Sequence, residues 1–281
     1  MAAIWSSSQP ASSRRFHAPR SSTRRRYRGP VSSAPVLQSF AGGRLVAERH
    51  GSGEPTLVAL HGWGRSRSDY AAMLALLGEP ALAVDLPGFG LSAPPPWPWT
   101  PKDYAAFFAE RLLATLAAPV VVVGHSFGGR VAVHLAASCP EAVGALVLTG
   151  VPLFREPNAA RPVLAYRVVR ALSRSGLIGE RRLEAARRRY GSADYRNAEG
   201  VMREVLVASL AASDDDAVAS VRCPVALVWG ARDTAAPLSV AERAQVAFRR
   251  AHLEVLDDDH FVPLHHPEAM AQAIASVRGE R

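Results

Sequence analysis

Short apolar runs recur along the chain, and several hold no polar position that could face water. Such runs are typical of strands buried on both faces of a parallel sheet. Two shorter runs, 36–40 and 44–49, are joined through a pair of glycines and predict a β-hairpin ahead of the others. Helical patterns alternate with several later runs, so we expect an α/β protein. The predicted strands after the hairpin are 56–60, 81–86, 120–123, 145–150, 225–230 and 252–256.

One long segment interrupts this alternation. About seventy residues separate the predicted strand at 145–150 from the one at 225–230. Within them, apolar residues recur at helical spacing over 161–173 and 201–211, which predicts helices there. The expected organisation is therefore a core made of 36–151 and 223–281, with a mostly helical insertion at 152–222.

Composition and charge narrow the class of protein. With 281 residues, 48% of them hydrophobic, the chain can enclose a large core. The formal net charge is +8, but residues 1–35 hold seven arginines and no acid, so the remainder is close to neutral and no nucleic-acid partner is expected. Two cysteines exclude a disulfide framework. Because no apolar stretch reaches the roughly eighteen residues of a membrane span, we expect a cytoplasmic protein.

The basic leader at 1–35 is rich in Ser, Arg and Pro and lacks the apolar core of a secretory signal. Three interpretations fit it: a disordered basic tail, a transit-like leader, or upstream sequence included through a wrongly chosen start. We favour a dispensable disordered segment, because its composition is poor in apolar residues and high in charge.

The strand at 120–123 leads into Gly-His-Ser-Phe-Gly, and a helical pattern follows at once. A serine held between strand and helix adopts a strained backbone conformation that exposes its hydroxyl. Gly124 and Gly128 remove side chains that would collide in so tight a turn. The amide of Phe127, at the start of the helix, points to where an attacked carbonyl oxygen gathers charge. The pattern predicts a nucleophile elbow with Ser126 as the nucleophile.

A serine hydroxyl needs a histidine base and an acid that orients this base. Asp233 follows the predicted strand at 225–230, and His260 follows the one at 252–256. Both residues therefore lie at the carboxyl edge of the predicted sheet, where active-site groups of parallel sheets gather. We predict Asp233 as the acid and His260 as the base.

Other histidines and acids are interpreted differently. His125 adjoins the nucleophile and is expected to pack beside it, since its side chain should point away from that of the serine. His265 and His266 precede Pro267, where a final helix is predicted to begin, and are interpreted as surface or helix-start residues. The acids at 257–259 are interpreted as a solvated loop, because adjacent residues seldom orient a neighbour's ring.

The second oxyanion donor is expected after the strand at 56–60, where His-Gly-Trp-Gly occupies 61–64. The flanking glycines permit a tight turn, so the backbone N–H of Trp63 can reach the same oxyanion as that of Phe127. No group of residues has the spacing of metal ligands, and nothing in the sequence calls for a cofactor.

Five motifs follow one another in order: His-Gly-Trp-Gly at 61–64, Asp-Leu-Pro-Gly-Phe-Gly at 85–90, Gly-His-Ser-Phe-Gly-Gly at 124–129, Gly-Ala-Arg-Asp at 230–233 and Asp-His-Phe at 259–261. With them the chain resembles the α/β-hydrolase superfamily, in its serine carboxylesterase-like branch, which contains the pimeloyl-carrier-protein methyl ester esterases. The resemblance implies an α/β-hydrolase fold, with a mostly parallel eight-stranded sheet, helices on both faces and a helical lid at 152–222. The site residues that it implies are Ser126, Asp233 and His260, with oxyanion amides from Trp63 and Phe127.

The expected function is hydrolysis of an ester, or of a related small acyl substrate, through an acyl-enzyme. The same triad also serves thioester, lactone and carbon–carbon bond hydrolysis and cofactor-free perhydrolysis, which stay open as alternatives. A non-catalytic module that binds a small ligand is the alternative outside enzymes. The thirteen arginines of 152–222, against nine acids, are interpreted as a solvated helix face or, alternatively, as attracting an anionic acyl donor. The oligomeric state is left open.

Overall fold

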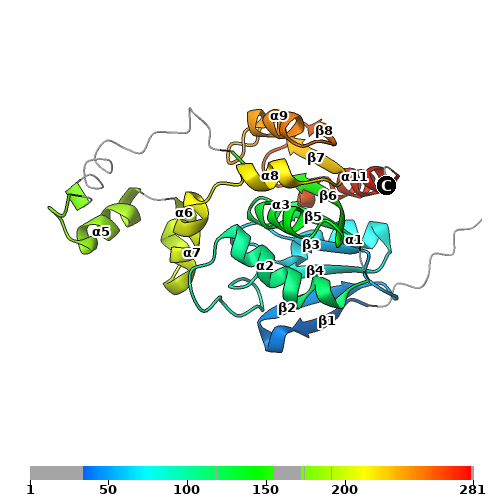
Figure 1. Cartoon of the computed structure of the whole chain (residues 1–281), viewed down its shortest axis with the longest axis horizontal. Helices are drawn as coiled ribbons and strands as arrows, with labels where there is room; N and C mark the ends of the chain where they lie inside the picture. The colour runs from blue at the N-terminus through cyan, green and yellow to red at the C-terminus, as the bar shows by residue number, and fades with distance from the viewer. Residues whose placement is uncertain (1–33, 118, 155–171, 174, 191, 280–281) are drawn as a thin grey trace, which may run out of the picture. The chain divides into compact units, whose positions relative to one another are not determined.

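A computed structural model describes residues 34–117, 119–154, 172–173, 175–190 and 192–279 (Figure 1). Most of the basic leader at 1–35 lies outside these residues, and so does most of the helix expected at 161–173. Among the described helices, none is both long and apolar enough to cross a bilayer.

Eight strands form one sheet, in the order β1-β2-β4-β3-β5-β6-β7-β8. β1 and β2 form the predicted antiparallel hairpin, and β2 also pairs antiparallel with β4. The other neighbouring strands pair in parallel, so the expected mostly parallel sheet is confirmed. The strands are β1 Val36–Phe40, β2 Leu45–His50, β3 Leu57–Leu60, β4 Ala81–Asp85, β5 Val120–His125, β6 Val143–Thr149, β7 Val225–Gly230 and β8 Ala251–Leu256.

The central strand β5 shows why the apolar runs are unbroken. Val120 and Val122 pack into the core on one face of the sheet, whereas Val121 and Val123 pack into the core on the other. Successive side chains of a strand point to opposite faces, so a strand covered on both faces needs an apolar residue at every position. All four valines are fully buried.

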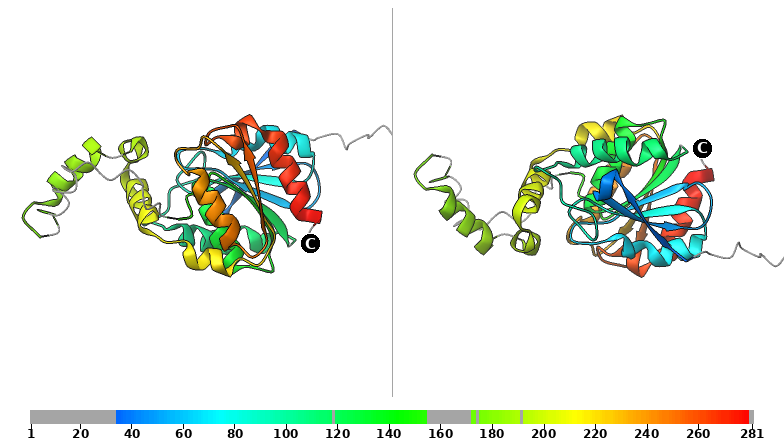
Figure 2. Two further views of the ribbon diagram at one scale, coloured as in Figure 1. Left: turned by 90° about the horizontal axis from the view of Figure 1, so that it is seen from above. Right: turned by 90° about the horizontal axis from the view of Figure 1, so that it is seen from below.

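Helices cover both faces of the sheet (Figure 2). α1 and α11 pack on one face, and α2, α3, α8 and α9 pack on the other. The described helices are α1 Ala71–Leu77, α2 Pro101–Arg111, α3 Phe127–Ser138, α5 Glu180–Tyr190, α6 Ala193–Asn197, α7 Gly200–Ala211, α8 Asp215–Ser220, α9 Leu238–Ala247, α10 Val262–His265 and α11 Pro267–Gly279, with short 3-10 turns at Ala41–Gly43, Arg67–Tyr70 and Leu113–Thr115.

The segment between β6 and β7 holds α5 to α8 in the part of the chain that the structure describes. α7 confirms the helix predicted over 201–211. Val205 of α7 is fully buried in the core, and Met202 packs against the same core from the preceding turn of the helix. Tertiary packing therefore supports this helix.

Strands β3, β5, β7 and β8 run in parallel, so their carboxyl ends lie at one edge of the sheet. The chain segments that follow these four strands carry Trp63, Ser126, Asp233 and His260. The topology thus brings residues from four distant parts of the chain to the edge where parallel sheets place their active sites.

Candidate active site

Ser126 sits between β5 and α3 with φ 50° and ψ −115°. Positive φ is uncommon for a residue other than glycine and stores backbone strain. The Ser126 amide donates a 3.0 Å hydrogen bond to the carbonyl oxygen of Thr149, at the end of the neighbouring strand β6. The strained conformation that the sequence predicts for this serine is therefore present.

Two glycines let α3 pass close to the sheet. A Cβ atom on Gly124 would lie 2.5 Å from the Cα of Gly129, and one on Gly128 would lie 2.3 Å from the carbonyl oxygen of Leu60. Both separations are far below contact distance, so side chains at these positions would push the helix away from the strands. The predicted reason for the two glycines is confirmed.

His260 and Asp233 form a hydrogen-bonded pair. The Nδ1 atom of His260 lies 2.7 Å from Oδ2 of Asp233, although the residues come from different loops. The other carboxylate oxygen, Oδ1, accepts hydrogen bonds of 2.8 Å from the backbone amides of Ala235 and Ala236. Asp233 is only 5% exposed, so its carboxylate is fixed on both sides and holds the imidazole ring in one orientation.

His125 also contacts His260. Its Nε2 atom lies 2.9 Å from the carbonyl oxygen of His260, and the two ring centroids are 4.7 Å apart. Burial, with a smaller contribution from the charge of His260, lowers the pKa of His125 to about 3. The ring is therefore neutral above pH 4 and donates its Nε2–H to that carbonyl. The structure thus gives His125 a packing role.

The Ser126 hydroxyl makes no hydrogen bond within the described residues, so it is not bonded to this pair. The residue that precedes it, His125, contacts His260 with the two rings tilted by 53°. The Ser126 side chain faces Gly62, where an added Cβ would lie 3.3 Å from the serine Cβ. The structure therefore brings Asp233 and His260 into direct contact, and it places Ser126 at the same carboxyl edge of the sheet.

Aromatic rings join the two loops that carry Trp63 and Phe127. The ring of Trp63 meets the ring of Phe127 edge to face, with centroids 5.4 Å apart, and that of Phe89 at 4.9 Å. Among the described residues, neither the Trp63 amide nor the Phe127 amide has a hydrogen-bond acceptor. Sequence reasoning gave no role to Phe89, although its turn belongs to the motif at 85–90.

His61 is a second residue whose role the sequence did not reveal. It is fully buried, its Nε2 atom accepts a 3.0 Å hydrogen bond from the Leu86 amide, and its Nδ1 atom lies 2.7 Å from the carbonyl oxygen of Gly62. Burial lowers the pKa of His61, which keeps the ring neutral, with a proton on Nδ1 only. This neutral ring ties the loop that carries Trp63 to the end of β4.

The acidic loop at 257–259 differs in part from the expected solvated loop. Asp257 and Asp259 are exposed, but Asp258 is only 8% exposed, so that interpretation is wrong for Asp258. Its carboxylate lies 3.0 Å from Nδ1 of His265. Donor atoms of Asp258, Asp259 and His265 lie within 4.8 Å of one another, a metal-like grouping that residue spacing did not indicate. The contact with His265 accounts for the buried carboxylate.

The two buried neutral histidines predict a loss of stability in acid. Their pKa values lie below the ordinary value of 6.5, so the unfolded chain binds protons that the folded chain does not. The free energy of unfolding should therefore fall as pH is lowered from about 6.5 towards 3, by up to about 1.4 kcal/mol per pH unit for His125. Urea unfolding at pH 7.5, 6.0 and 5.0 measures this, and the His125→Gln variant should show a shallower dependence. Equal slopes for the two proteins would contradict the neutral state of His125.

The chain matches known sequences over most of its length. A family model described as the alpha/beta hydrolase family matches residues 57–273. An esterase of Mycobacterium tuberculosis (strain ATCC 25618 / H37Rv) is 38% identical over 127 residues, which cover 44% of this chain but only 41% of that protein. A pimeloyl-[acyl-carrier protein] methyl ester esterase of Aromatoleum aromaticum is 34% identical over 250 residues, which cover 79% of this chain and 98% of that protein.

The same fold occurs among solved structures. The crystal structure of a hydrolase from Pseudomonas aeruginosa PA01 superposes with a TM-score of 0.66 and 21% sequence identity. The superposition covers 88% of this chain and 98% of that one. At this level of identity, the likeness concerns the fold alone.

Proposed function

The chain belongs to the alpha/beta hydrolase family, and on this premise we propose that it hydrolyses carboxylic esters through an acyl-enzyme formed on Ser126. The observation that carries the proposal is the 2.7 Å hydrogen bond between His260 and Asp233, at the edge of the sheet where Ser126 has a positive φ. Strain, a fixed base and its orienting acid are the parts that serine hydrolysis requires. The esterase names of the two relatives agree with this choice of substrate class.

The proposed first step is attack of the Ser126 hydroxyl on the ester carbonyl. Asp233 holds the proton of His260 on Nδ1, which leaves Nε2 free to take the hydroxyl proton as the new C–O bond forms. The imidazolium then gives this proton to the departing alcohol. Asp233 stabilises the charged ring throughout, because its carboxylate is already fixed by two backbone amides.

The proposed oxyanion hole consists of the amides of Trp63 and Phe127. Both amides lack an acceptor among the described residues, and ring contacts hold their loops together. Loss of one such donor typically costs about 3 kcal/mol of transition-state stabilisation. In the second step His260 activates a water molecule, which cleaves the acyl-enzyme and releases the acid.

We further propose that 152–222 acts as the lid over this site. A Cβ atom on Gly88 would lie 2.2 Å from the sulfur of Met202, so α7 packs directly on the turn at 87–90. That turn carries Phe89, whose ring contacts Trp63. Met202 and Phe89 are therefore our candidates for the apolar wall that receives the acyl chain.

One lid arginine has a structural role. Arg203 pairs with Glu184 at 3.3 Å and lies over the ring of Tyr195, with 5.6 Å between the guanidinium carbon and the ring centroid. These contacts hold α5, α6 and α7 together. We therefore propose that this arginine stabilises the lid and does not recruit a charged substrate.

The proposal predicts that the purified chain hydrolyses p-nitrophenyl acetate and butyrate with a higher kcat/KM than matched thioesters or lactones. Initial rates on the three substrate classes measure this, with Ser126→Ala as the blank. Lowering the salt removes the screening of exposed charges. An ester that carries a carboxylate should nevertheless gain less than about threefold in kcat/KM, since Arg203 is engaged in an ion pair within the lid. A clear preference for thioesters or lactones would contradict the proposed substrate class. A large salt effect would support the alternative in which lid arginines attract an anionic acyl donor.

A further inference from the structure

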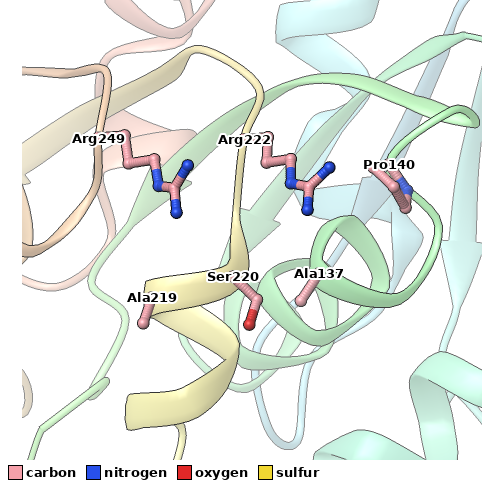
Figure 3. A pocket seen from close by; sticks show the side chains of 6 residues that line it. All are labelled: Ala137, Pro140, Ala219, Ser220, Arg222 and Arg249. Carbon is pink, nitrogen blue, oxygen red and sulfur yellow. The ribbon is translucent and has the colours of Figure 1, made fainter.

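A pocket of about 340 Å³ lies where the chain enters three neighbouring strands (Figure 3). Its walls come from the end of α3 and the loop after it, from the end of α8 and its link to β7, and from the link between α9 and β8. A volume of this size is at the lower end of the range of small-ligand sites, roughly 300 to 1,000 Å³. The lining residues are Ala137, Pro140, Ala219, Ser220, Arg222 and Arg249.

This pocket is separate from the candidate active site. Arg222 and Arg249 precede β7 and β8, whereas Asp233 and His260 follow the same two strands. The pocket therefore lies at the amino edge of the sheet, and the candidate active site lies at the carboxyl edge. α3, which begins next to Ser126, has 12 residues and so spans about 18 Å towards the pocket.

The two arginines of the pocket are unlike most others in the core. Both are exposed, and neither forms an ion pair or hydrogen bond with another residue that the structure describes. By contrast, Arg67, Arg130 and Arg278 each contact a carboxylate at 2.5 Å. Figure 3 shows the guanidinium groups of Arg222 and Arg249 turned the same way. Two like charges that line one pocket repel each other, and a bound anion would offset that repulsion.

We propose that Arg222 and Arg249 form a binding site for the dianionic phosphate group of a small phosphorylated ligand. Two guanidinium groups match a dianion in charge, and each can donate two parallel hydrogen bonds to phosphate oxygens. The other residues that line the pocket are uncharged. The Ser220 hydroxyl already donates to the carbonyl oxygen of Asp216 at 2.7 Å, so it adds no charge and no free donor. The small volume of the pocket favours a small ligand over an extended macromolecular surface.

Titration of the full chain with inorganic phosphate, followed by calorimetry at constant ionic strength set with chloride, tests this site. Saturable binding is expected for the unmodified protein, and Arg222→Gln/Arg249→Gln should weaken it at least tenfold. The matched control is Arg44→Gln/Arg111→Gln, which removes the same charge from exposed arginines elsewhere and should leave binding unchanged. Because all four side chains are exposed, each variant should fold, and unchanged circular dichroism checks this.

A second arm distinguishes a soluble ligand from a lipid headgroup. Vesicles of phosphatidylcholine with and without phosphatidic acid are sedimented with the same proteins. Binding of inorganic phosphate without arginine-dependent binding to the phosphatidic acid vesicles supports a soluble ligand, whereas arginine-dependent binding to both supports a phosphate site that also accepts a headgroup.

Three results would overturn the proposal: no saturable phosphate binding, equal binding by the unmodified protein and the pocket variant, or an equal loss in the control variant. Hydrolysis of p-nitrophenyl acetate should change less than about twofold in the pocket variant, since the pocket lies about one helix length from Ser126. Phosphate binding does not depend on the serine chemistry, so failure of the proposed hydrolysis leaves this test intact.

Discussion

Ser126→Ala is expected to lower kcat for p-nitrophenyl acetate by roughly 10⁴- to 10⁶-fold, because the acyl-enzyme then has no oxygen on which to form. The side chain is small and only partly buried, so the fold should be retained. Initial rates on protein purified in parallel with the unmodified chain measure the effect.

The matched control for this variant is Ser138→Ala. Ser138 is an exposed serine at the far end of the same helix, and its hydroxyl donates to the carbonyl oxygen of His134. Its removal should leave kcat within about twofold, since surface substitutions rarely alter the structure elsewhere. If Ser126→Ala kept more than about 1% of the activity, the nucleophile would have to be another group.

The largest expected effect on stability is at Arg130, four residues after the serine on α3. Its guanidinium binds the Asp214 carboxylate at 2.5 and 3.1 Å, the Ser209 carbonyl oxygen at 2.7 Å and the Ala212 carbonyl oxygen at 3.1 Å. Asp214 is 1% exposed, so Arg130→Met leaves a buried carboxylate with His134 as its remaining side-chain partner. We expect the free energy of unfolding to fall by about 3 to 5 kcal/mol, measured in urea at pH 7.5.

A double variant separates two contributions to this loss of stability: the lost Arg130–Asp214 interaction and the cost of leaving the Asp214 carboxylate buried without its arginine. Arg130→Met/Asp214→Leu removes both charges, so it should be more stable than Arg130→Met alone, by at least about 1 kcal/mol. The carbonyl groups of Ser209 and Ala212 still lose their donor, which prevents full recovery. A double variant whose loss equals the sum of the two single losses would contradict a direct interaction.

This network also links the candidate lid to the candidate active site. Arg130 holds the end of α7 and the start of α8 against the helix that begins at Ser126. Any change in the position of α7 therefore acts on the helix that presents the nucleophile. Sequence reasoning did not find this contact, because Arg130 and Asp214 are 84 residues apart and neither belongs to a recognisable motif.

The sheet, in contrast, was predictable from local pattern. Strands covered on both faces need an apolar residue at every position, and the run Val120–Val123 meets this requirement without exception. The insertion of β4 between β2 and β3 was not derivable from pattern, since pairing partners depend on which distant runs meet in the folded chain. The family resemblance implied an eight-stranded, mostly parallel sheet, whereas the order of its strands comes from the structure.

The candidate active site was likewise predictable where local sequence pattern decides and not where distant contacts decide. Ser126, Asp233 and His260 could be proposed from sequence because each follows the end of a predicted strand, and the structure places the last two in hydrogen-bond contact. His61 and Asp258 were missed or misjudged because their burial arises from distant segments. From sequence alone, a polar side chain in a short loop is expected to be exposed to solvent, and only the folded structure shows whether distant segments bury it.

The central claim is that Ser126 is the nucleophile of an acyl-transfer site. Its most direct test is labelling of the intact protein with a fluorophosphonate, followed by mass mapping of the modified peptide. The account predicts a single adduct on the Ser126 hydroxyl, with loss of ester hydrolysis in proportion to labelling and no adduct in Ser126→Ala. An adduct on a different residue, or full hydrolysis by the protein labelled at Ser126, would contradict it.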